Sequence, residues 1–127
     1  MDPKEIENHI RKRYSDKLFD VNCLAEELKL SESYLREITN MNYNCSPHHL
    51  IETIRLERAI ILLCNKQKYI YSICLEVGYA NLKTFREAFK KCMRMTPNEF
   101  KNIIRKSKDV QKEKEKLTQY LWNFSNI

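Results

Sequence analysis

The chain has 127 residues, a formal net charge of +6 and a hydrophobic content of 43%, which suits one domain or two very small ones. The positive charge favours an anionic partner such as nucleic acid. No run of about 18 apolar residues is present, which excludes a transmembrane helix, and the first residues lack the apolar segment of a signal peptide. We therefore expect a cytoplasmic protein without a membrane partner.

A single glycine and three prolines indicate an all-α fold with abrupt helix ends, because tight β-hairpins usually need glycine. Helices are expected to begin at cap residues, some followed by proline at the first helical position. In chain order these caps are Asp2, Asp20, Ser31, Ser46, Asn81 and Thr96. Apolar residues behind them recur every three or four positions, for example Tyr34, Leu35 and Ile38. The helix from Ser46 to about Cys64 is the longest.

Gly78, the single glycine, lies in the stretch VGYANLKTF. Glycine reaches positive φ without steric cost and commonly ends a helix. A helix over about 70–77, a turn at Gly78 and a new helix from Asn81 give the helix-turn-helix pattern. An ordinary corner between two helices of a bundle is the alternative.

An internal repeat favours the helix-turn-helix. A shift of fifty residues places Arg36-Glu37 on Arg86-Glu87 and Ser46-Pro47 on Thr96-Pro97. Each unit is a short helix, a tight turn, a second helix and a proline-started helix. The long helix between the units has about 18 residues and spans about 27 Å. Two such units could place one helix in each of two successive major grooves of DNA.

The second unit resembles the AraC/XylS family of bacterial transcription regulators in the stretch ICLEVGYANLKTFREAFKKCMRMTPNEFK. The family pattern there is I-A-x-x-V-G-F, F-x-x-x-F-K-K and T-P-x-x-[FY]. The first unit fits more loosely, and the resemblance covers about residues 18–106. It implies an AraC-type DNA-binding domain over 1–106, with a first unit at about 18–45, a linker helix at 47–64, a second unit at 69–106 and a charged, amphipathic extension at 107–127.

The chain departs from the family pattern at several positions. Cys74 replaces a small alanine, and Arg94 replaces the glycine before the Thr-Pro element, with Asn44 as its counterpart in the first unit. Asparagine tolerates left-handed φ better than arginine does. Thr39-Asn40 replaces the usual Phe-Lys, and the loss of the phenylalanine puts the core packing of the first unit in doubt.

The resemblance implies one recognition helix per unit, here residues 32–40 and 82–92, with the groove-facing side chains off the apolar stripe. Arginine and lysine pair with guanine, asparagine with adenine, and glutamate accepts from cytosine. The predicted base-facing residues are Glu32, Ser33, Arg36, Glu37, Asn40, Asn81, Leu82, Lys83, Arg86, Glu87 and Lys90. The predicted phosphate contacts are Ser31, Lys91 and Thr96.

Three charged residues allow two interpretations each. Glu87 either accepts from cytosine or forms an intrahelical ion pair with Lys83 or Lys91, and we favour the ion pair. Glu37 lacks such a partner, so we expect it to face the groove. Arg55 is expected to be a structural ion-pair residue rather than a DNA contact.

The extension after Ser107 carries a stripe of Val110, Leu117, Leu121 and Phe124. We expect this stripe to dock on its own domain. The alternatives are a weak dimer contact, with the chain otherwise a monomer on DNA, and a contact with RNA polymerase or another protein.

The predicted function is a sequence-specific transcription regulator, favoured as an activator that recruits RNA polymerase. A degenerate helix-turn-helix pair that binds proteins and not DNA is the alternative. A thiol or metal sensor is less favoured, since the five cysteines are widely spaced without a CxxC pair. No cofactor, metal site or catalytic constellation is expected, so the chain is not predicted to be an enzyme.

Overall fold

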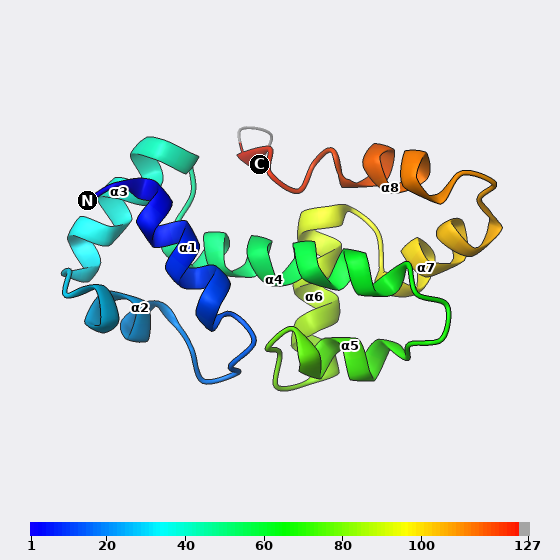
Figure 1. The fold of residues 1–127 in the computed structure, drawn as a ribbon, viewed down its shortest axis with the longest axis horizontal. Helices are drawn as coiled ribbons and strands as arrows, with labels where there is room; N and C mark the ends of the chain where they lie inside the picture. Colours follow the sequence, from blue (N-terminus) through cyan, green and yellow to red (C-terminus); the bar gives the residue numbers. More distant parts are fainter. Residues whose placement is uncertain (125–127) are drawn as a thin grey trace.

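The computed structural model describes residues 1–124, and this part of the chain contains helices without strands (Figure 1). The predicted all-α fold is therefore confirmed. The helices are α1 (Pro3–Arg13), α2 (Val21–Leu28), α3 (Glu32–Tyr43), α4 (Pro47–Leu63), α5 (Ile70–Glu76), α6 (Leu82–Met93), α7 (Pro97–Lys106) and α8 (Val110–Thr118). The predicted extension reaches 127, and its residues 125–127 lie outside the described part.

The predicted caps begin the helices as expected, and the two units use them at equivalent positions. The Ser31 hydroxyl accepts from the Tyr34 amide at 3.1 Å, and the Asn81 side chain accepts from the Thr84 amide at 2.9 Å. Thr96 and Glu99 form a reciprocal capping box at the start of α7. These bonds span only three residues, which is why the sequence identifies them.

The long helix α4 runs between two groups of helices (Figure 1), and its residues belong to two hydrophobic cores. Its first half gives Leu50, Ile51 and Ile54 to the core of α1, α2 and α3. Its second half gives residues such as Leu56 and Leu63 to the core that includes Phe85, Phe89 and Phe100. Because one rigid helix belongs to both cores, it couples the position of α3 to that of α6.

The turn inside each helix-turn-helix has the same hydrogen-bond pattern but a different central residue. The Lys29 amide donates to Glu26 and the Leu30 amide to Ala25, while the Gly78 amide donates to Leu75 and the Tyr79 amide to Cys74. Lys29 has φ 59° and Gly78 has φ 103°. Positive φ alone therefore does not explain the glycine, since a lysine occupies the equivalent turn.

Close approach of the α1–α2 loop explains Gly78. A Cβ atom there would lie 2.3 Å from the backbone oxygen of Tyr14 and 2.9 Å from Nε of Arg55. Real Cβ atoms do not approach so closely, so any other residue would push the loop away. Gly78 thus lets the second unit touch the loop that begins the first unit.

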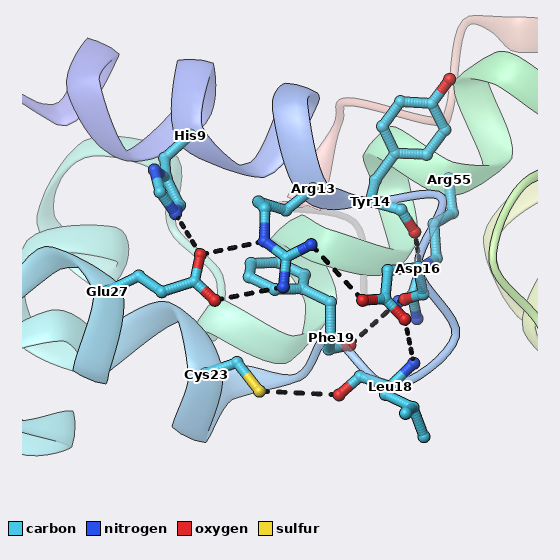
Figure 2. A network of polar contacts seen from close by, with 9 residues as sticks. All are labelled: His9, Arg13, Tyr14, Asp16, Leu18, Phe19, Cys23, Glu27 and Arg55. Atoms are coloured by element: carbon cyan, nitrogen blue, oxygen red, sulfur yellow. Dashed lines mark hydrogen bonds and ion pairs between the residues drawn. The ribbon is translucent and has the colours of Figure 1, made fainter.

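Arg55 fastens the same loop to α4. Its Nε donates to the Tyr14 carbonyl at 2.9 Å, and its Nη2 donates to the carbonyls of Asp16 and Phe19 at 3.1 and 2.9 Å (Figure 2). Its guanidinium also lies 5.6 Å from the centre of the Tyr79 ring. The expected structural role is confirmed, but the expected ion pair is wrong, because the acceptors are backbone carbonyls.

Side-chain ion pairs hold the other side of the loop (Figure 2). Arg13 binds Glu27 through Nε at 3.0 Å and Asp16 through Nη1 at 3.4 Å. His9 lies 2.7 Å from the same Glu27 carboxylate. The bonds from Arg13 and His9 to Glu27 lower the pKa of Glu27 and tie α1 to α2.

The extension docks on its own chain, as predicted. After α8 the chain returns along α4 (Figure 1). Leu121 packs into the second core and Phe124 into the first, and the indole nitrogen of Trp122 donates to Glu57 at 2.8 Å. Arg11 of α1 binds the other oxygen of Glu57 at 2.7 Å. The tail therefore bridges both cores across the outer side of α4.

Helix α3 differs from the sequence-based expectation at Tyr34 and packs a small residue, Thr39, into its core-facing side. Tyr34, predicted on the buried stripe, is 42% exposed, whereas Leu35 and Ile38 are buried. Thr39 stands where the family pattern has phenylalanine and is fully buried, with its hydroxyl bonded to the Arg36 carbonyl at 3.1 Å. The small side chain is accommodated because it satisfies its polar group on its own helix.

Within residues 1–124, none of the helices combines the length and apolar composition that a bilayer-spanning segment requires.

Candidate nucleic-acid interface

The exposed faces of α3 and α6 carry the predicted base-facing residues. Leu35, Ile38 and Thr39 anchor α3 in the first core, and Phe85, Ala88 and Phe89 anchor α6 in the second. Most of the predicted base-facing positions point away from these cores. The exposed candidates are Glu32, Ser33, Arg36, Glu37, Asn40, Asn81, Lys83, Arg86, Glu87 and Lys90. Helical periodicity accounts for this separation of buried and exposed residues.

Leu82 is the exception among the candidates. Its side chain is partly buried and packs against the second core at the start of α6. Only part of this leucine is free for contact with a thymine methyl group.

The predicted phosphate contacts lie at helix starts and on α6. Ser31 and Thr96 already accept backbone hydrogen bonds as caps, yet each hydroxyl retains a proton that a phosphate oxygen could accept. The amide groups at the starts of α3 and α7 add partial positive charge there. Lys91 is exposed on α6.

Exposed side chains outside the predicted set extend these faces. Tyr34 and Thr84 occupy equivalent exposed positions in the first turns of α3 and α6. Arg94, the left-handed C-cap of α6 with φ 62°, adds a cation at the other end of that helix. The fifty-residue repeat pairs Tyr34 with Thr84, so the signal for both was present in the sequence.

The two recognition helices differ sharply in charge. α6 carries Lys83, Arg86, Lys90 and Lys91 against the single carboxylate of Glu87. α3 carries Arg36 against Glu32 and Glu37. The positive potential of the chain is therefore concentrated on the second unit, and the first presents a slightly acidic helix.

Glu37 and Glu87 form no ion pair with any residue in the described part of the chain. Within residues 1–124, no lysine or arginine nitrogen lies within 4.0 Å of the carboxylates of Glu37 or Glu87. The intrahelical ion pair expected for Glu87 is therefore not formed. Both carboxylates remain available as acceptors.

Lys91 belongs to a group of polar side chains where α6 crosses the first half of α4. His48 lies 3.1 Å from Glu52, and this hydrogen bond raises the pKa of His48. Burial, together with the positive charge of Lys91, lowers the pKa of His49. Burial raises the pKa of the Cys92 thiol to about 11, so this cysteine is protonated at neutral pH.

The arrangement of histidine, cysteine and acidic side chains does not support a metal-binding or redox role. Within the described residues, histidine, cysteine, aspartate and glutamate side chains form no group of three that could hold a metal ion. Cys45 and Cys74 are buried, and burial raises the pKa of both thiols.

Comparisons with known proteins place this geometry in a recognised class. Residues 24–103 match the model of a family described as a helix-turn-helix domain. The chain is 32% identical over 100 residues to the Msm operon regulatory protein of Streptococcus mutans, covering 79% of this chain and 36% of that protein. It is 28% identical over 98 residues to the arabinose operon regulatory protein of Escherichia coli, covering 77% and 34%.

A solved structure agrees with the fold. The C-terminal domain of AraT, a response regulator from Geobacillus stearothermophilus, superposes with a TM-score of 0.74 at 31% identity, covering 79% of this chain and 83% of that one. The chain spans about a third of the length of the two operon regulators named above. The two named relatives are operon regulatory proteins, and the solved structure is the C-terminal domain of a response regulator.

Proposed function

Because the chain belongs to the AraC-type helix-turn-helix family, we propose that it is a sequence-specific DNA-binding transcription regulator. The observation that carries the proposal is the pair of exposed helices α3 and α6. Each follows a turn with the same hydrogen-bond pattern and begins at a capped residue, and both pack against the shared helix α4. A bacterial cytoplasm, where duplex DNA is accessible, is the proposed place of action.

The proposed binding mode places α3 and α6 in two successive major grooves on one face of the duplex. The domain would comprise residues 1–106, with units at 18–45 and 69–106 and the linker at 47–64. The base-facing set is the one predicted from the sequence, with Tyr34 and Thr84 added. Ser31, Lys91 and Thr96 would hold phosphates.

The regulatory outcome proposed is activation through contact with RNA polymerase, with the chain acting as a monomer. The docked tail supports a monomer, because Leu121 and Phe124 are already buried against the chain's own cores. The tail is thereby less available for the dimer contact considered above.

Binding to a random pool of duplexes across a salt series tests the proposal. We expect enrichment of a motif with half-sites about 10 bp apart, and an affinity that falls steeply with salt. Salt-dependent binding without an enriched motif would contradict sequence specificity. A lack of binding at low salt would contradict DNA binding and favour the protein-interaction alternative.

The charge difference between α3 and α6 predicts that the second unit supplies the salt-dependent affinity. Changing Lys83 and Lys90 to glutamine should lower the slope of log affinity against log salt by about 1 to 2, because each lysine charge removed from the groove releases about 0.9 fewer counterions. The measurement is fluorescence anisotropy across the salt series. Lys112 and Lys116, exposed on α8, changed to glutamine together provide a control of equal charge. An equal effect of the control pair would show that net charge alone matters.

Glu37 is predicted to restrict which sequences the first unit accepts. Its unpaired carboxylate repels phosphates and accepts only from donors such as cytosine N4. Glu37→Gln should raise affinity for random duplex by about threefold to tenfold and relax the motif at one base pair, where a wrong base normally costs about 1–3 kcal/mol. Parallel selection with both proteins checks this. An unchanged motif would place Glu37 outside the groove.

A further inference from the structure

The extension builds a cavity that the helix-turn-helix core would not form by itself. The cavity measures about 140 Å³ and lies between the start of α4, the end of α6 and the tail. His49, Lys91 and Arg94 line it on the core side, and Tyr120 and Phe124 line it on the tail side. A cavity of about 150 Å³ is large enough to hold one benzene ring.

The walls of this cavity combine positive charge with aromatic surface. Arg94 lies over the Tyr120 ring, with its guanidinium carbon 4.3 Å from the ring centre, which holds this cation at the rim. Lys91 adds a second cation. Among residues 1–124, no carboxylate lies within ion-pair distance of either side chain, and none lines the cavity. Such a pair of cations favours an anion.

The apolar part of the cavity is held in place by ring packing. The Phe124 ring meets the His49 ring edge-on, with centres 4.8 Å apart, and His49 Nε2 lies 3.8 Å from the Cys92 sulfur. Because burial and Lys91 lower the pKa of His49, its imidazole is neutral at neutral pH and offers a hydrogen bond without a charge.

We propose that this cavity binds a small aromatic carboxylate, with its ring against Phe124 and its carboxylate between Lys91 and Arg94. An uncharged ring would give Lys91 and Arg94 no anionic partner inside the cavity, and a small inorganic anion would leave the aromatic wall exposed. The aromatic wall therefore favours a ligand with a ring, and the two cations favour one with a carboxylate.

A nuclear magnetic resonance titration of the full-length, ¹⁵N-labelled chain with benzoate tests the site. We expect saturable shifts around Arg94 and Phe124, with a Kd on the order of 1 mM for so small a ligand. Benzyl alcohol, which lacks the charge, and acetate, which lacks the ring, should bind more weakly. Absence of saturable shifts up to about 20 mM benzoate, or equal binding of benzyl alcohol, would overturn the proposal.

Variants separate this cavity from general surface charge. Arg94→Gln should weaken benzoate binding about tenfold, the effect of losing one charge-assisted contact. Phe124→Leu should weaken it while keeping the tail packed by an apolar side chain. Arg105→Gln is the control, since Arg105 is exposed on α7 and bonded to Asn102 outside the cavity. Equal losses in Arg94→Gln and Arg105→Gln would overturn the site.

A regulatory consequence follows and rests on the proposed function. Because Lys91 is both a cavity wall and a proposed phosphate contact, bound benzoate should weaken DNA binding relative to chloride at the same ionic strength. Unchanged DNA affinity at saturating benzoate would overturn this regulation. The titration contains no DNA, so a failure of the proposed function would leave its result intact and the two failures can be distinguished.

Discussion

Replacing Gly78 by alanine should destabilise the protein by about 3–4 kcal/mol and lower its Tm by about 10–15 °C. Two costs combine. Alanine is strained at φ 103°, and its Cβ would lie 2.3 Å from the backbone oxygen of Tyr14. That oxygen cannot retreat easily, because it accepts a hydrogen bond from Arg55. Thermal and denaturant unfolding measure the loss. Gly78→Val should cost more, since a branched side chain tolerates positive φ least.

The first unit supplies the matched control for this prediction. Lys29 occupies the equivalent turn with φ 59° and an exposed side chain. Lys29→Ala should change stability by less than about 0.5 kcal/mol, because lysine already carries a Cβ atom at this positive φ and its side chain is exposed. If Gly78→Ala melts like the parent, the contact between the α1–α2 loop and the second unit does not hold as described.

Features that depend on near neighbours in sequence were predictable. The caps at Ser31, Asn81 and Thr96 bond to amides three residues away, so residue type and spacing identify them. The buried stripes followed helical period, although Tyr34 at the first turn of α3 escaped burial. The turn at Gly78 was likewise predictable, because glycine commonly follows the end of a helix.

Features that depend on distant contacts were not predictable. Gly78 and Arg55 owe their main constraints to carbonyls of the α1–α2 loop, and a backbone carbonyl has no signature in sequence. The role of Glu57 was also not predictable, because its carboxylate accepts hydrogen bonds from Arg11 and Trp122, which lie far from it in the sequence. The expected Glu87 ion pair failed because spacing of four residues permits such a pair without requiring it.

The candidate interface shows the same division. Which residues of α3 and α6 are exposed follows from periodicity, and the excess of cations on α6 is visible in the sequence. The cavity beside Arg94 depends on where the tail packs. Sequence alone predicted docking of the tail but not the partners of Phe124.

Removal of the Arg55 guanidinium should cost about 3–5 kcal/mol of stability. Arg55→Met keeps most of the volume but leaves the carbonyls of Tyr14, Asp16 and Phe19 without their buried donor. Arg55→Lys should fall between the parent and Arg55→Met, because one ammonium cannot reproduce the planar fork. Urea unfolding of each variant measures the loss. Arg58→Met, an exposed arginine on the same helix, is the control and should be nearly neutral.

Combining Arg55→Met with Gly78→Ala distinguishes a shared junction from two separate defects. Both changes act on the Tyr14 carbonyl, which Arg55 holds and the new Cβ would displace. Once the guanidinium is absent, the loop can move away from the methyl group, so the double variant should lose less than the sum of the single losses by about 1 kcal/mol or more. Strictly additive losses would mean that the two residues act independently. In that case α4 and the tail would fix the arrangement of α3 relative to α6, and the α1–α2 loop would not contribute to it.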